Sequence, residues 1–197
     1  MNQRLLAISA TVLLFSAVAL ADDTYQVRYA ANLNIGDSFV DFTNTGATVA
    51  NGVSQNLCMN LYTFDPAEEL ISCCTCSVTP DGLQSLSVLK SLISNTLTPA
   101  IPTSVVIKAV ASTGTCNASV VSGLAHGALL WGTTLHQNTS TATATYAMTE
   151  GAFQFADLSA AELTHITTTC GFIQSDGSGF GICKGCAAGG LGAASAQ

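Results

Sequence analysis

The sequence predicts a mainly β protein, a single β-sandwich-like domain that is stapled by disulfides and carries one short capped helix near its C-terminus. Three observations lead to this prediction. Short apolar runs with alternating polar residues recur along the chain between Gly, Pro and Asn turn signals. Eight cysteines occur among 197 residues, behind an export leader. One segment near the C-terminus has a complete helix-capping pattern.

The first residues have the layout of a secretory signal peptide. Arg4 precedes an apolar run that ends in a small-x-small cleavage site at Ala21. The run is short and an acidic pair follows it, so a transmembrane anchor is disfavoured. We therefore expect a signal peptide (1–21), a secreted disulfide-stapled domain (22–186) and a flexible Gly/Ala tail (187–197), with the mature protein extracellular or at the cell surface.

Charged residues are scarce. They make up 9% of the chain, against about 25% in a typical soluble domain. Without the leader, four basic residues stand against twelve acidic ones, which gives a net charge of −8. Nucleic acid and anionic membranes are poor partners for such a chain, because both need clustered Lys and Arg. A surface made mostly of small, uncharged residues has two interpretations. It either favours packing against copies of the chain or a matrix, or serves solubility alone.

The segment Leu57–Val78 carries four of the eight cysteines and is expected to form a β-hairpin around a polar turn. Cys74 and Cys76 share one face of the second strand, and Cys73 lies on the other. A bond between Cys73 and Cys74 is disfavoured, because adjacent Cα atoms lie about 3.8 Å apart, below the usual disulfide range. We expect one bond inside the hairpin, from Cys58 to Cys76 or Cys74.

The two hairpin cysteines left over then need partners elsewhere, which would tie the hairpin to the C-terminal third by two long-range bridges. The last two cysteines would pair with each other, and the connectivity stays open at this point. The cysteines outside the hairpin are Cys116, Cys170, Cys183 and Cys186.

Zinc is the competing interpretation of these cysteines, since Cys-Cys-x-Cys and Cys183-x-x-Cys186 resemble ligand pairs. Disulfides are favoured, because an exported chain meets an oxidising compartment and no histidine lies near either cluster in the sequence. A thioredoxin-like role is also disfavoured, because the Cys183/Cys186 pair follows a glycine-rich run instead of opening a helix in a βαβ unit. We predict no bound metal and no cofactor.

Alternating and β-branched patterns predict further strands on both sides of the hairpin. The segment 83–97 fits either a strand or a helical turn, and 47–56 is expected to be a loop. The predicted strands are 24–33, 38–43, 104–110, 120–135 and 146–155.

One helix is expected to begin at Ala160, because Ser159 and Glu162 form a capping box. It is expected to end near Thr169, with Gly171 as its C-terminal stop. Cys170 would lie on its apolar face, which places that cysteine in the stapled core.

Catalytic motifs are missing from the sequence, and we predict that the protein is not an enzyme. His126, His136 and His165 have no ligand or catalytic spacing, so each is interpreted as structural. A hydrolytic enzyme that uses His126 or His136 ranks last among the hypotheses. Asn117 and Asn138 match the N-glycosylation sequon, which functions only in a host with that machinery.

Three blocks of the chain carry a resemblance: NLNIGDSFVDFTNTG, CMNLYTFDPAEELISCCTCSVTPDGL and CGFIQSDGSGFGICKGC. They resemble small secreted, cysteine-rich bacterial proteins of the acidobacterial type, a group with no assigned function, and the likeness extends over most of the mature chain. The resemblance implies export and a shared cysteine framework, and it implies no activity.

These observations favour an exported non-enzymatic structural or interaction protein, such as a self-assembling subunit of an extracellular filament or surface layer. Its partners would be copies of itself or a matrix component. Tyr25, Val27 and Tyr29 alternate along the N-terminal strand. That strand either adds to the sheet edge of a neighbour, as in donor-strand complementation, or folds back as an ordinary first strand.

The alternative is a monomeric secreted module that binds carbohydrate or peptide. Trp131, Tyr146 and Phe153 are its candidate aromatic contacts. The competing interpretation places these side chains in the core, which we favour for Trp131 in particular.

Overall fold

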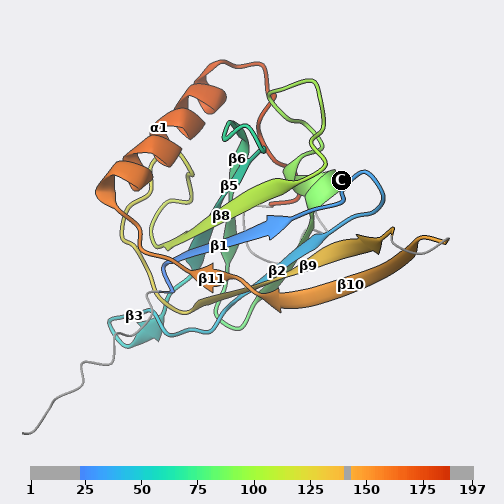
Figure 1. The fold of residues 1–197 in the computed structure, drawn as a ribbon. Coiled ribbons are helices and arrows are strands. Elements are labelled where there is room, and N and C mark those ends of the chain that lie inside the picture. The colour runs from blue at the N-terminus through green and yellow to red at the C-terminus, as the bar shows by residue number, and fades with distance from the viewer. Residues whose placement is uncertain (1–22, 140–142, 187–197) are drawn as a thin grey trace, which may run out of the picture.

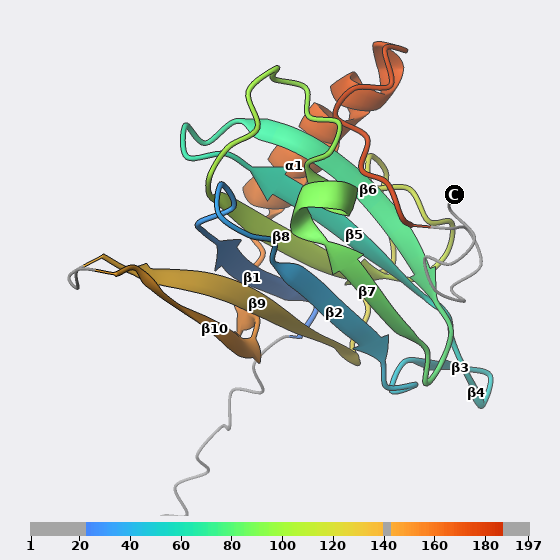
Figure 2. The same ribbon diagram turned by 90° about the vertical axis from the view of Figure 1, so that its right-hand side faces the viewer.

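The computed structural model describes residues 23–139 and 143–186, so the expected signal peptide and Gly/Ala tail lie outside the described residues. Within this part, two antiparallel sheets face each other, a small two-stranded ribbon lies at one end, and a helix covers one sheet from outside (Figures 1 and 2). The mainly β, sandwich-like fold with a C-terminal helix agrees with the prediction.

The first sheet has five strands in the order β11-β1-β8-β5-β6. Each strand runs antiparallel to its neighbours. The strands are β1 (Tyr25–Ala30), β5 (Leu57–Phe64), β6 (Leu70–Val78), β8 (Val105–Ser112) and β11 (Gln154–Phe155).

The second sheet has four strands in the order β10-β9-β2-β7, again antiparallel throughout. The strand predicted over 120–135 corresponds to β9. It begins later than predicted, at Ala128, and extends three residues further, to Asn138. The strands are β2 (Phe39–Asn44), β7 (Leu83–Ser87), β9 (Ala128–Asn138) and β10 (Thr145–Ala152).

Two apolar clusters hold these layers together. The larger one fills the space between the sheets, where Phe42 and Leu130 of the second sheet meet Leu61 of the first. The smaller one lies on the opposite face of the five-stranded sheet, beneath α1 (Ala160–Ser175), and includes Tyr62 and Ile166. The five-stranded sheet is therefore the middle layer, covered on both faces.

Strand β5, in the middle layer, illustrates what burial on both faces requires of a strand. All eight of its residues are buried, although its sequence includes polar residues. A buried polar group needs a partner, because water cannot supply one. The Asn60 amide donates to the carbonyl oxygen of Val110 at 3.0 Å and to the Ser112 hydroxyl at 2.9 Å.

The predicted helix start is confirmed and its predicted end is wrong. Ser159 is the N-cap, and its side chain accepts a hydrogen bond from the Glu162 amide at 3.1 Å. The helix passes through Gly171 and ends at Ser175. Its last turn places Ile173 in the smaller apolar cluster, and this burial outweighs the cost of a glycine inside a helix, about 1 kcal/mol.

Two segments differ from their expected structure. The ambiguous 83–97 segment contains both alternatives, strand β7 followed by a short π-helical turn, η1 (Val88–Leu92). The expected loop at 47–56 contains a ribbon of β3 (Val49–Ala50) and β4 (Val53–Ser54). Asn51 and Gly52 both have positive φ there, the conformation that an Asn-Gly hairpin turn adopts, so the signal was present in the sequence.

The eight cysteines form four disulfides, and the expected bond inside the hairpin is not among them. Three bridges, where two were expected, tie the hairpin to the C-terminal third. The pairs are Cys58–Cys116, Cys73–Cys170, Cys74–Cys183 and Cys76–Cys186.

A β-bulge explains why the expected pairing is wrong. Phe64 pairs with Leu70 and Thr63 with Ser72, so Ile71 is an extra residue on β6. One extra residue on β6 shifts every later pair by one position, so each residue of β5 now shares its face with the neighbour of its expected partner. Cys58 therefore lies opposite Ser77 and on the face turned away from Cys74 and Cys76. Its partner comes from the loop after β8 instead.

Candidate binding surface

The outer face of the four-stranded sheet carries exposed apolar side chains. Directly paired residues of antiparallel strands share a face, as do alternate residues of one strand. Met148 of β10 pairs with Leu135 of β9, which places both on the face of Trp131. Phe39 of β2 joins them, because it precedes the Asp41–Trp131 pair by two residues. Met148 is 54% exposed and Phe39 40%.

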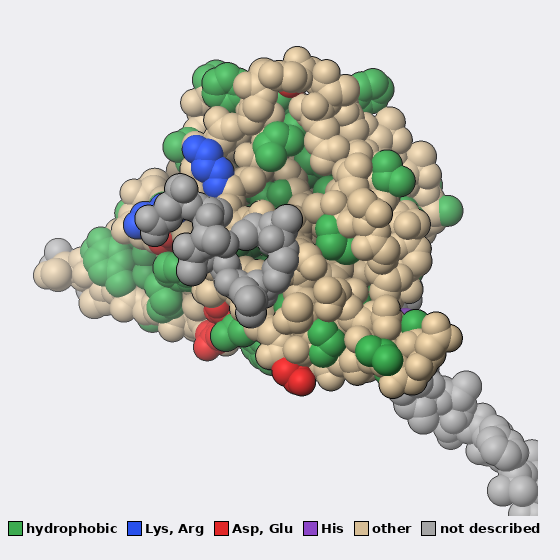
Figure 3. All heavy atoms as spheres, turned by 180° about the vertical axis from the view of Figure 1, so that it is seen from behind, with side chains coloured by type: hydrophobic (Ala, Val, Ile, Leu, Met, Phe, Trp, Pro, Cys, Tyr) green, Lys and Arg blue, Asp and Glu red, His purple; other side chains and the backbone are tan. Residues whose placement is uncertain are grey.

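Few charges interrupt the surface as a whole. On the face seen in Figure 3, acidic and basic side chains are few, and hydrophobic side chains lie scattered among small polar ones. This agrees with the 9% of charged residues in the chain. The surface therefore offers little electrostatic repulsion against association.

Strand β10 forms one edge of the four-stranded sheet and pairs with β9 without a register shift. Seven of its eight residues are exposed, on both faces of the strand, and the eighth is Gly151. The hairpin of β9 and β10 extends beyond the sandwich (Figure 1). Natural sheets protect their edges with Lys, Pro, bulges or short strands. The sequence of β10, TYAMTEGA, has one charge and neither Lys nor Pro.

An arginine holds the base of this hairpin in place. The Arg28 side chain of β1 passes beneath Gly132 and Gly151, which pair with each other across the hairpin. A Cβ at Gly132 would lie 2.6 Å from Arg28 Cδ, so a larger residue there would displace the arginine side chain. The guanidinium donates to the carbonyl oxygen of Ala152 at 3.2 Å. The root of the hairpin is thus fixed to the other sheet, while its far end is exposed.

The structure separates the aromatic residues proposed as ligand contacts. Phe153 is 2% exposed and belongs to the core. Trp131 is half-buried on the outer face, so the preferred interpretation of it as a core residue is wrong. Trp131 pairs with Ala152, six residues along β10 from Tyr146. Tyr146 and Trp131 therefore do not form one stacking platform.

The candidate assembly strand is β1, which lies inside the five-stranded sheet between β8 and β11. Tyr25 is 5% exposed, whereas Tyr29 is 57% exposed. Val27 packs at the margin of the smaller apolar cluster. Within one chain this strand folds back, so donation to a neighbour would require it to leave its own sheet.

The three histidines lie in three different environments. His126 Nδ1 is 2.8 Å from Asp23 Oδ1, at the start of the described chain. His136 Nε2 is 2.8 Å from the Thr149 hydroxyl, on the β9–β10 hairpin. The ring of His165 in α1 stacks on Phe64, with centroids 6.5 Å apart. The structure does not bring these histidines together.

A cleft of about 350 Å³ lies between α1 and the turn of the cysteine hairpin. Its lysine, Lys108, is already paired with Glu162 at 2.5 Å and lies 4.5 Å from the ring centroid of Phe64. Asp65 Oδ1 accepts hydrogen bonds from the amides of Ala67 and Glu69 within the turn. These three charged groups serve the fold, and Glu68 and His165 complete the polar lining of the cleft.

Burial shifts two tyrosines away from their usual titration range. Desolvation, with a smaller contribution from the Glu162 carboxylate, raises the pKa of Tyr25 to about 12. Desolvation also raises the pKa of Tyr62, whose hydroxyl donates to the carbonyl oxygen of Ala118 at 2.7 Å. Both tyrosines stay protonated in the folded state well above neutral pH.

At the surface, hydrogen bonds from the backbone and side chain of Ser178 lower the pKa of Asp176.

One further group of side chains has the composition of a metal site. The sulfurs of Cys74, Cys183 and Cys186 all lie within 4.8 Å of one another. All three cysteines are in disulfides here.

The side chain of Asn117, the asparagine of one glycosylation sequon, is used within its own loop. Its Oδ1 accepts hydrogen bonds from the amide and hydroxyl of Ser119.

The fold and its surface define a class, a disulfide-stapled β-sandwich with an exposed edge strand and an outer face that carries exposed apolar side chains. Comparison with protein-family models, with curated proteins and with solved structures finds no match to this chain. In the part of the chain that the structure describes, no helix has the length and apolar character needed to cross a bilayer. The four disulfides fit an oxidising, extracellular type of environment.

Proposed function

We propose that the protein is an exported, non-enzymatic structural protein that associates with copies of itself through the edge of β10. The observation that carries the proposal is this strand, which lies at a sheet edge with exposed side chains on both faces and one charge among eight residues. An unprotected edge presents backbone donors and acceptors that a second strand can pair with.

A second copy is the occupant because the surface of this chain suits like partners. Backbone pairing between two β10 strands is self-complementary, and the scarcity of charge limits repulsion between copies. The exposed apolar side chain of Met148, on the edge strand itself, would lose contact with water in the pair. Each Å² of apolar surface removed from water contributes roughly 25 cal/mol.

Pairing of two β10 strands about a two-fold axis closes at a dimer. Growth into a filament or surface layer needs a second, different contact. The N-terminal strand β1 remains the proposed source of that contact, through exchange with the equivalent strand of a neighbour. A dimer would therefore indicate the β10 contact alone, whereas a larger assembly would indicate that a second contact operates as well.

The test is the size of the exported, unreduced mature protein, measured by light scattering and by electron microscopy of the same sample. Dimers or regular polymers are expected. Met148→Lys, which places a cation on the edge strand, should reduce association. Phe172→Lys is the matched control, because Phe172 is 70% exposed on α1 and the added charge is identical. A monomeric wild type at all concentrations, or a Met148→Lys variant that assembles like the control, would overturn the proposal.

A second candidate function is a monomeric binding module, and the partial exposure of Trp131 beside Phe39 favours it. Trp131 is the single tryptophan, so its fluorescence reports directly on this surface. Saturable quenching of Trp131 by a soluble oligosaccharide or peptide, in a protein that stays monomeric, would support this function over assembly.

A further inference from the structure

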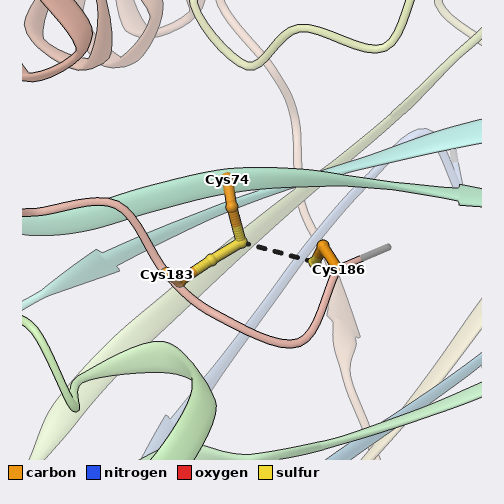
Figure 4. Close-up of side chains that lie close together, drawn as sticks. All are labelled: Cys74, Cys183 and Cys186. Carbon is orange, nitrogen blue, oxygen red and sulfur yellow. Dashed lines mark hydrogen bonds between the residues drawn. A yellow bond between two sulfur atoms is a disulfide. The ribbon is translucent and has the colours of Figure 1, made fainter. Parts of the chain in front are cut away.

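Two of the four disulfides lie side by side on β6, the edge strand of the five-stranded sheet. Cys74 and Cys76 project from the same face of β6, and their partners Cys183 and Cys186 come from one short loop. The sulfur of Cys74 is 3.5 Å from that of Cys186, across the two bridges. Figure 4 shows Cys74, Cys183 and Cys186 pointing toward one another. The four sulfurs thus form one cluster.

We propose that these four cysteines, Cys74, Cys76, Cys183 and Cys186, form a tetrathiolate site that binds one zinc-like soft metal ion when their two disulfides are reduced. Zinc takes four thiolates in a tetrahedron with Zn–S distances of about 2.3 Å, which places its ligand sulfurs about 3.8 Å apart. Three of the sulfurs already lie within 4.8 Å of one another, and the fourth, of Cys76, is bonded to Cys186. Reduction would free the Cys76 side chain from Cys186, and its rotation toward the other three sulfurs would complete the ligand set.

The supporting backbone does not depend on the disulfides alone. The loop that carries Cys183 and Cys186 is held by backbone hydrogen bonds, from the Lys184 amide to the carbonyl oxygen of Ser91 and from the Cys73 amide to that of Gly181, both at 2.8 Å. Gly185 lies between the two cysteines with φ +89°, a conformation that lets the loop turn back toward β6. These contacts keep the four thiols near one another after reduction.

The surroundings also suit a soft metal. Cys74, Cys76 and Cys183 are 7%, 0% and 9% exposed and belong to the main apolar cluster. Cys186 is half-buried and packs at the margin of that cluster, which leaves a route for an ion from solvent. Thiolates select zinc and related ions over magnesium or calcium, which prefer oxygen ligands. Three of the four sulfur ligands would thus be buried in apolar packing, and Cys186 would be the partly exposed one.

The chemistry balances with a phosphine as reductant. Each disulfide takes up two electrons from one trialkylphosphine, water supplies the oxygen of the phosphine oxide, and two thiols form. A divalent ion then displaces four protons from the four thiols, so binding is favoured at higher pH. A dithiol can replace the phosphine, with one cyclic disulfide formed for each bridge reduced.

The test uses the mature chain, reduced with a trialkylphosphine without oxygen and titrated with cobalt(II), then with zinc. We expect one cobalt per chain with the visible absorption of a tetrahedral tetrathiolate, displacement of cobalt by zinc, and a higher unfolding temperature for the zinc-loaded reduced protein. The double variants Cys74→Ser/Cys183→Ser and Cys76→Ser/Cys186→Ser should bind cobalt more weakly by at least about tenfold, the loss seen when even an outer-shell partner is removed.

Cys58→Ser/Cys116→Ser is the matched control, because it also removes one disulfide but leaves the cluster intact. It should bind cobalt like the wild type. Three results would overturn the proposal: a reduced wild type that binds no cobalt, a control that loses as much affinity as the cluster variants, or zinc binding that does not raise the unfolding temperature. The last result would identify binding to thiols of an unfolded chain.

Discussion

A disulfide joins Cys73 of β6 to Cys170 of α1 and fastens the helix to the face of the five-stranded sheet that is turned away from the sandwich core. The two residues are 97 positions apart in the sequence. The next residue, Cys74, points to the opposite face of the sheet and bonds to Cys183. Neighbouring residues of one strand thus hold the helix and the segment after it from opposite faces.

Replacing Cys73 and Cys170 together with alanine is expected to lower the free energy of unfolding by about 2–5 kcal/mol, the usual effect of removing a native disulfide. The helix should be the first part to lose protection, because the bridge is its covalent link to the sheet. Urea denaturation measures the free energy, and amide hydrogen exchange measures the protection of α1.

The variant Cys58→Ala/Cys116→Ala serves as the control for this prediction. Its bridge closes a shorter separation of 58 residues and joins two residues that both lie outside α1. It should also lose stability, while α1 keeps most of its protection. Equal exchange of the α1 amides in both variants would contradict the specific role of the Cys73–Cys170 bond.

The fold class and the capped helix could be predicted from local sequence signals. The capping box at Ser159 acts through its own neighbours, and Cys170 follows from the helical period, so both predictions needed no tertiary information. The disulfide map could not be predicted, because a single extra residue, Ile71, changes which face Cys58 shares. Nothing in the local sequence marks that bulge.

The candidate surface was also only partly predictable. Tyr146 was correctly placed on a strand, yet its exposure depends on β10 being a sheet edge, and strand order is a property of the whole fold. Trp131 was expected in the core because large aromatic residues are buried on average. In the described part of the chain no further layer covers the outer face of the four-stranded sheet, and α1 covers the other sheet.

Gly171→Ala is expected to stabilise the protein by about 0.5–1 kcal/mol, because glycine inside a helix is less favourable than alanine. The added methyl group has room, since a Cβ there would lie 3.6 Å from Ser119 Cβ. A rise in the thermal unfolding temperature of about 2–4 °C per kcal/mol, for a chain of this size, would report the gain.

Gly181→Ala is the paired change with the opposite expected sign. Gly181 has φ +74°, and a Cβ there would lie 2.6 Å from Cγ2 of Ile173, a buried residue in the last turn of α1. Backbone strain and this clash should lower the unfolding temperature. If both glycine variants shifted the temperature in the same direction, the helical placement of Gly171 would be in doubt.

Stability is expected to fall at alkaline pH because of the buried tyrosines. An unfolded tyrosine titrates near pH 10, and burial raises the pKa of Tyr62 and Tyr25 above this value in the folded protein. A raised pKa means that the contribution to stability is complete below about pH 10 and is lost as the pH rises toward the folded values. For Tyr62 the slope approaches about 1.4 kcal/mol per pH unit in that window.

Tyr62→Phe isolates this contribution. The substitution leaves the Ala118 carbonyl without its 2.7 Å hydrogen bond from Tyr62, which should cost about 1–3 kcal/mol near neutral pH. It also removes one alkaline titration, so the decline of stability above about pH 10 should be shallower than in the wild type.

Tyr29→Phe is the control, since Tyr29 is 57% exposed. It should change neither the stability near neutral pH nor the alkaline slope appreciably. Urea denaturation between neutral pH and pH values above about 10 provides both measurements. An unchanged alkaline slope in Tyr62→Phe would show that other groups govern the loss of stability.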